Sequence, residues 1–203
     1  MIKTIIFDFG AIFINLDKAC SMQKFLEAAK IESLDDDMIL KNQQYEVGLI
    51  STEAFISFYA EKFPHLSKPV IIDLWNSILL DFPKKRLEFI KSLSAKNTYR
   101  LILLSNTNDL HISWIKRHIS FYEEFKSQFD AFYLSHEINL RKPNRDIYEY
   151  VLKENNLKAH ECLFIDDTFE NTETAKTLGI RVWNLNEQTE DIVQLFDLKK
   201  DLF

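Results

Sequence analysis

The sequence predicts an α/β fold with three layers, in which a parallel sheet has helices on both faces and a small helical segment is inserted after the first strand. Five short apolar runs are continuous rather than alternating, which is typical of strands buried on both faces. Helical patterns separate the last four runs, and strands that alternate with helices imply right-handed crossovers and a parallel sheet. The chain has 203 residues, which suits one such domain with an insertion.

The elements of the sheet layer follow from these runs. The expected strands cover residues 3–8, 99–104, 131–134, 162–165 and 180–183. The expected helices cover residues 109–119, 143–154 and 168–178. Pro143 is placed at the first position of the second of these helices, where its missing N–H costs nothing. Gly179 lies between a helix and the next strand, where a left-handed C-cap is expected.

Residues 18–83 break the alternation of strands and helices. Their apolar residues recur at helical spacing and no segment has a convincing strand pattern. We therefore expect a helical cap at 18–83 and an α/β core domain formed by 1–17 and 84–203. Because the cap would leave the sheet directly after the first strand, it should emerge beside Asp8, where a lid can exclude water and select substrates.

Composition excludes several classes of partner. The 31 acidic and 25 basic residues are spread along the chain and give a net charge of −6, so no basic surface for nucleic acid is expected. No apolar stretch approaches the roughly 18 residues of a membrane span, and no signal peptide is recognisable. Cys20 and Cys162 lie far apart, which favours free thiols in a reducing compartment. We expect a cytoplasmic protein, as a monomer or a weak homodimer, with no membrane partner.

Acidic residues end two of the predicted strands. Asp8 ends the first, and Asp166 and Asp167 follow the fourth. In an open parallel sheet, ligands bind at the carboxyl ends of the strands. A phosphate monoester is a dianion that repels an attacking carboxylate, and a divalent cation between them removes the repulsion. Carboxylates are the hard oxygen ligands that Mg²⁺ prefers, so three acids at one crevice favour a Mg²⁺ site.

Two further segments fit the same chemistry. Ser105, Asn106 and Thr107 follow the second strand, where the Ser105 hydroxyl and the Asn106 amide can point at a phosphate. Taken alone, Ser105 is better explained as the N-cap of the next helix. Lys142 precedes a helix-opening proline, and it is either a solvated lysine or the cation that balances the charge of a nucleophile and a phosphate.

These four segments, in this order and with a cap after the first, resemble the motifs of the haloacid dehalogenase superfamily, whose members are mostly Mg²⁺-dependent phosphatases with a Rossmann-like core. The resemblance covers nearly the whole chain. It implies that Asp8 is the nucleophile that forms an aspartyl-phosphate and also binds Mg²⁺. It further implies that the Gly10 carbonyl and Asp167 are metal ligands, and that Asp166 acts directly or through a water.

The same resemblance implies that Ser105 and Asn106 bind the phosphate and that Lys142 balances its charge. One residue departs from the pattern: most phosphatases of this superfamily place a second aspartate, the general acid, where this chain has Gly10. Ile12 replaces the usual threonine further on. The Asp-x-Gly pattern is similar to that of sugar-1-phosphate phosphatases. Asp17 is a candidate substitute acid, although a helix N-cap at the cap boundary explains it better.

The expected activity is hydrolysis of small phosphorylated metabolites, sugar phosphates among them, through an aspartyl-phosphate. Two alternatives stay open: a metal-independent 2-haloacid dehalogenase that uses the same aspartate, and a binding module that has kept the fold without catalysis. The paired acids Asp166 and Asp167 favour a cation and so the phosphatase. His111 lies in the helix that begins beside the expected phosphate site and could titrate near neutral pH, but packing or solvation more often explains a histidine on a helix face. The polar stretch 42–46 would contact substrate if the cap reaches the site, although a solvated helix face explains the same residues.

Overall fold

The computed structural model describes residues 1–203, which form five strands and eleven α-helices with three short 3₁₀ segments. The strands are β1 (Thr4–Phe7), β2 (Arg100–Ser105), β3 (Ala131–Leu134), β4 (Cys162–Asp166) and β5 (Arg181–Asn184). The helices are α1 (Lys18–Ala29), α2 (Asp36–Glu46), α3 (Thr52–Lys62), α4 (Lys68–Asn76), α5 (Lys84–Ala95), α6 (Asp109–His118), α7 (Tyr122–Lys126), α8 (Ser135–Ile138), α9 (Arg145–Glu154), α10 (Phe169–Thr177) and α11 (Leu195–Leu198). The 3₁₀ segments are Ala159–Glu161, Ile192–Gln194 and Lys200–Leu202.

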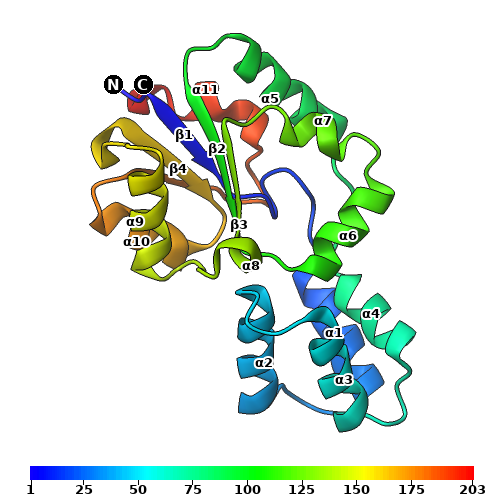
Figure 1. The fold of residues 1–203 in the computed structure, drawn as a ribbon. Coiled ribbons are helices and arrows are strands. Elements are labelled where there is room, and N and C mark those ends of the chain that lie inside the picture. The colour runs from blue at the N-terminus through cyan, green and yellow to red at the C-terminus, as the bar shows by residue number, and fades with distance from the viewer.

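The five strands form one parallel sheet in the order β3-β2-β1-β4-β5 (Figure 1). β1 lies at the centre, with Phe7 opposite Leu103 on one side and opposite Ile165 on the other. All five strands therefore end at the same edge. No helix is long and apolar enough to cross a membrane.

The sheet is buried on both faces, as the continuous apolar runs predict. Successive residues of each central strand enter two different cores: Ile5 and Phe7 of β1 belong to one, and Ile6 belongs to the other. α5, α6, α7 and α11 cover the first face, and α9 and α10 cover the second (Figure 1). Because neither face is solvated, alternation of polar and apolar residues is absent from the strands.

The five strands lie within one residue of their predicted bounds. Gly179 has φ of +83° after α10, which confirms the left-handed C-cap. The position given to Pro143 is wrong: α9 begins at Arg145 with Asn144 as its N-cap, so Pro143 precedes the helix and belongs to the loop that carries Lys142. α5 was not among the expected helices.

The helices α1–α4, which we call the cap helices, lie at the edge where the strands end (Figure 1). They have a core of their own, centred on the stacked rings of Tyr45 and Phe55. Asp17 is the N-cap of α1 and its side chain accepts a hydrogen bond from the Cys20 N–H, as the capping interpretation predicts. The domain boundaries at residues 17/18 and 83/84 stay a prediction.

The C-terminal end of α2 docks on the sheet layer. The Ser135 hydroxyl donates to the Glu46 carbonyl over 2.6 Å, and the Asn139 amide donates to the Val47 carbonyl over 2.8 Å. Gly48 follows with φ of +68°, and a Cβ at this residue would lie 2.2 Å from the His136 carbonyl oxygen. Only a residue without a side chain permits this approach.

A second contact joins α4 to α6 through polar side chains. His111 stacks on Trp75, and its Nε2 donates to the Trp75 carbonyl over 3.2 Å. Asn108, the N-cap of α6, accepts from the Trp75 indole N–H and the His111 backbone N–H, while its amide lies 3.2 Å from His111 Nδ1. Both nitrogens of the neutral ring are thus satisfied, and burial lowers the pKa of His111 to about 4.

Replacing Gly48 should weaken the fold more than replacing the other left-handed glycine. Gly48→Ala and Gly179→Ala both place an alanine at positive φ, which costs about 1–2 kcal/mol. Only Gly48→Ala also meets a backbone atom, whereas a Cβ at Gly179 has its nearest neighbour at 3.9 Å. Overpacking of this kind costs about 1–3 kcal/mol more. Urea unfolding of the two variants measures the difference, and equal losses would contradict a tight approach of Gly48 to His136.

The His111 ring should make stability depend on pH. Because the unfolded chain takes up a proton near 6.5 and the folded chain only near 4, stability is lost as pH falls from about 6.5 towards 4. His111 is partly exposed, so the loss is at most about 3 kcal/mol. His111→Gln should flatten the fall of unfolding free energy over this range. His118→Gln, at an exposed position of the same helix, is the control and should keep the wild-type slope.

Candidate active site

Pairing of β1 with its two neighbours brings the predicted site residues to one edge. Asp8 follows β1 directly, and its backbone N–H donates to the Ile165 carbonyl over 2.9 Å. β4 ends at Asp166, and β2 on the other side of β1 ends at Ser105. The strand ends therefore place Asp8 between the other two, and Asp167 follows Asp166 out of the sheet.

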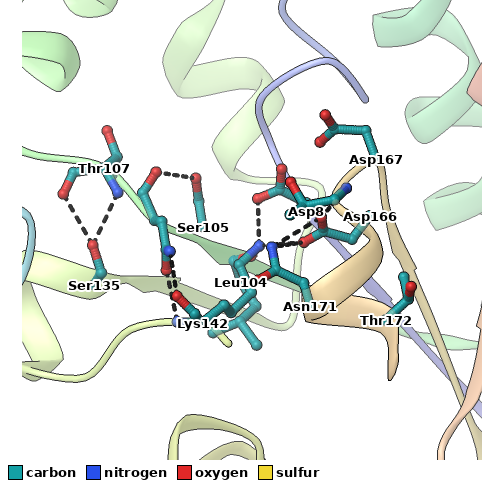
Figure 2. A network of polar contacts seen from close by, with 12 residues as sticks. Asp8, Leu104, Ser105, Thr107, Ser135, Lys142, Asp166, Asp167, Asn171 and Thr172 are labelled. Atoms are coloured by element: carbon teal, nitrogen blue, oxygen red, sulfur yellow. Dashed lines mark hydrogen bonds and ion pairs between the residues drawn. The ribbon is translucent and has the colours of Figure 1, made fainter. Parts of the chain in front are cut away.

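Lys142 reaches into this edge from the loop before α9. Its ammonium donates to Asp8 Oδ1 over 2.6 Å, to Asp166 Oδ2 over 2.7 Å and to the Leu104 carbonyl over 2.9 Å (Figure 2). These bonds use all three of its donors. The side chain is 1% exposed, so the interpretation of Lys142 as a solvated lysine is wrong. Burial alone would lower the pKa of Lys142, but the charges of Asp166 and Asp8 raise it above its ordinary value.

Both carboxylate oxygens of Asp166 accept hydrogen bonds. Its Oδ1 accepts from the Thr168 backbone N–H over 2.8 Å, and the Asn171 amide lies 3.0 Å from both carboxylate oxygens (Figure 2). With Lys142 on Oδ2, both of its oxygens are engaged. Asp166 is fully buried, and this set of partners fixes the position of the Lys142 ammonium.

Asp8, Asp166 and Asp167, which we call the acid cluster, offer carboxylate oxygens within 4.8 Å of one another. Burial raises the pKa of Asp8 to about 7; Lys142 opposes the shift, and the negative Asp166 and Asp167 add to it. Oδ2 of Asp8 accepts no hydrogen bond from the protein. A crowded set of hard oxygens with a free oxygen on the central member is the donor set that a divalent cation prefers.

Lys18, the first residue of α1, neutralises the outer side of the acid cluster. Its ammonium lies 2.5 Å from Asp167 Oδ2 and 3.7 Å from Glu187 Oε1. Although burial opposes it, the hydrogen bond and charge of Asp167 raise the pKa of Lys18. The Lys18 side chain is half exposed, so its ammonium is in contact with solvent, whereas the Asp167 side chain is only 9% exposed.

Gly10 lies beside the acid cluster in the loop after β1. Its carbonyl accepts a hydrogen bond of 2.6 Å from the Ile12 N–H, which leaves one lone pair of the oxygen free. A Cβ built on Gly10 would lie 3.8 Å from Asp8 Oδ2 and 2.8 Å from the end of the Leu16 side chain. The position is therefore open towards Asp8 and restricted only by a flexible side chain.

Asn106 is fastened to the loop of Lys142 by two hydrogen bonds. Its amide donates to the Lys142 carbonyl over 2.8 Å, and its Oδ1 accepts from the Lys142 N–H over 2.9 Å. The Ser105 hydroxyl is buried and makes one long bond of 3.4 Å to the Asn106 carbonyl. The alternative of Ser105 as a helix N-cap is wrong, because Asn108 caps α6.

Three adjoining cavities extend from the acid cluster towards the cap helices. The acid chamber, about 390 Å³, is lined by Asp8, Lys142 and Asp167 among others. The middle chamber, about 410 Å³, lies over residues 105–108 and shares Gly10, Leu16, Glu46, Asn106 and Arg141 with the acid chamber. The apolar chamber, about 270 Å³, lies among the cap helices and shares Leu34, Asn42, Trp75, Ile78 and His111 with the middle chamber.

Several residues of this site were not singled out from the sequence. Asn171 is in the first turn of α10, and a helix that follows an acidic strand end is the one signal that could have pointed to it. Lys18 carries no such signal. Arg141 lies beside Lys142 and pairs with Glu46 of α2 over 2.6 Å, which places the end of the 42–46 stretch at the acid chamber.

Known proteins share this architecture. The sequence model of the haloacid dehalogenase-like hydrolase family matches residues 5–185. A D-ribitol-5-phosphate phosphatase of Bacteroides thetaiotaomicron is 27% identical over 198 residues, which cover 90% of this chain and 91% of that protein.

Two solved structures agree with this match. A haloacid dehalogenase family enzyme of Bacteroides thetaiotaomicron, crystallised with magnesium and inorganic phosphate, is 32% identical with a TM-score of 0.82, over 97% of this chain and 100% of that one. A protein of Porphyromonas gingivalis described as a predicted HAD-like family hydrolase is 28% identical with a TM-score of 0.82, over 100% of this chain and 98% of that one. Because the family model spans most of the sequence, including the whole acid cluster, the chain belongs to the haloacid dehalogenase-like hydrolases.

Proposed function

We propose that the chain is a Mg²⁺-dependent phosphatase that hydrolyses small phosphorylated metabolites through an aspartyl-phosphate on Asp8. The observation that carries this proposal is the buried Lys142 ammonium shared by Asp8 and Asp166, beside the free Oδ2 of Asp8. A carboxylate oriented by one oxygen and free at the other is arranged to attack. The phosphatase named among the relatives supports the same reaction class.

The acid cluster fits Mg²⁺. Asp8, Asp167 and the Gly10 carbonyl would hold the ion, and Asp166, whose oxygens are engaged, would act through Lys142 or a water. When bound, the ion would neutralise charge on the transferred phosphoryl group. The related enzyme crystallised with magnesium and inorganic phosphate supports this choice of metal.

Three residues of the chain would then have separate roles in the reaction. Asp8 attacks phosphorus in line, the alcohol leaves towards the middle chamber, and water hydrolyses the aspartyl-phosphate. Lys142 keeps a positive charge beside Asp8 throughout, since the two acids raise its pKa. Asn106 fixes the Lys142 loop, and its backbone N–H, which has no partner in the chain, is available to a phosphate oxygen.

The loop after β1 offers no second carboxylate that is free to protonate the leaving alcohol. Gly10 lacks a side chain, and Asp17 is occupied as the α1 N-cap. Glu46 lines both the acid and the middle chamber, where its carboxylate is held in an ion pair with Arg141. The reaction should therefore depend on a leaving group that tolerates negative charge, or on a proton from substrate or solvent.

Asp8→Asn should remove turnover and keep the fold. Loss of p-nitrophenyl phosphate hydrolysis of at least about 10³-fold is expected, because the nucleophile is gone. Unfolding temperature in EDTA should be unchanged or higher, since the substitution relieves repulsion from Asp166 and Asp167. Added Mg²⁺ should raise the unfolding temperature of wild type and much less that of the variant. Full wild-type activity in EDTA, or chloride release from 2-haloacids without metal, would instead favour the dehalogenase.

Leaving-group dependence tests the missing acid. We expect p-nitrophenyl phosphate to be cleaved about 10²- to 10⁴-fold faster than a simple alkyl phosphate. Gly10→Asp should narrow this ratio by speeding the alkyl ester, because the position is open towards Asp8. Gly10→Asn has nearly the same shape without an acid and is the matched control. If both esters are cleaved equally by wild type, another group already supplies the proton.

A further inference from the structure

The apolar chamber is not required by phosphoryl transfer at Asp8. It lies inside the cap helices, and nine of its thirteen lining residues are hydrophobic, among them Met22, Phe25, Phe55, Ile71 and Leu74. Cavities with apolar linings bind apolar molecules. The chamber is therefore suited to an apolar group.

Apart from the Asn42 amide nitrogen, the polar side chains at this chamber have partners within the protein, and the Lys18 ammonium is paired with Asp167. Tyr59 donates to Asn42 Oδ1 over 2.7 Å, and His111 donates to the Trp75 carbonyl. The Trp75 indole N–H is taken by Asn108, and the Ser21 hydroxyl by the Lys18 carbonyl. A polyol entering the chamber would lose its hydrogen bonds to water without replacing them, whereas a hydrocarbon group would gain.

Continuity with the acid cluster identifies the occupant. The middle chamber shares walls with the acid chamber on one side and with the apolar chamber on the other. Asn42 lines both the middle and the apolar chamber, and its amide nitrogen donates no hydrogen bond within the protein. A phosphomonoester held at Asp8 can thus extend through the half-polar middle chamber, meet one donor at Asn42, and end among hydrocarbon side chains.

Resting on the proposed phosphatase activity, we propose that the apolar chamber binds the distal end of the substrate's alcohol, so that the substrates are phosphomonoesters with an apolar end. An engineered cavity of about 150 Å³ takes up one benzene, so about 270 Å³ accommodates an apolar group of about ten carbon atoms. Sugar and polyol phosphates would leave this chamber unfilled and bind more weakly.

The test combines a binding measurement with kinetics. Calorimetry with 1-octanol and with ribitol probes the chamber without any chemistry. Octyl phosphate and D-ribitol 5-phosphate, both esters of unactivated alcohols, compare its effect on kcat/KM. Leu74→Trp fills the chamber, and Val70→Trp, at an exposed position one turn earlier in the same helix that does not line the chamber, is the matched control. Hydrolysis of acetyl phosphate, which is too small to reach the chamber, checks that each variant is folded.

We expect octanol to bind wild type and Val70→Trp alike, at least tenfold more weakly to Leu74→Trp, and ribitol to show no binding. Octyl phosphate should have at least tenfold higher kcat/KM than D-ribitol 5-phosphate, an advantage that Leu74→Trp removes while acetyl phosphate turnover persists. If both phosphates or acetyl phosphate are cleaved but octanol does not bind, the apolar site is refuted and the phosphatase stands. If octanol binds as expected and no phosphate is cleaved, the site stands and the proposed reaction fails.

Discussion

A single buried ammonium organises the edge of the sheet. Three acids gathered at adjacent strand ends repel one another, and Lys142 makes their approach tolerable by bonding to Asp8 and Asp166 at once. Removing the Lys142 ammonium would leave two buried carboxylates without a compensating charge, which is strongly destabilising. The supporting bonds have the same purpose: Asn106 holds the Lys142 loop and Asn171 holds Asp166. The charge arrangement is thus built into the fold rather than assembled when a ligand arrives.

Much of this arrangement could be predicted from the sequence, because strands buried on both faces leave a clear apolar signal and an acid at their end interrupts it. Asp8, Asp166 and Asp167 were found in this way, and the structure brings them together. The strands depend on short-range sequence patterns, and their predicted bounds differ from the observed bounds by no more than one residue.

The remainder depended on contacts between distant segments. Asn171 reaches Asp166 only because of how α10 is rotated on the sheet, and Lys18 reaches Asp167 only because α1 begins there. α2 buries little apart from Met38 and Tyr45, so its polar sequence gave a weak helical signal. Pro143 was misplaced because a helix-opening proline and a proline one residue before the N-cap look alike in sequence.

The central position of β1 has a further consequence. The chain leaves the middle of the sheet after Asp8, forms the cap helices and returns through α5 to β2, which is the neighbour of β1. None of the five strands of the sheet lies within residues 18–83, so changes of sequence or length there need not alter the pairing of the sheet. During evolution, such a segment can change its sequence and bind different substrates while the reacting carboxylate keeps its position. This architecture therefore permits divergence in substrate selectivity.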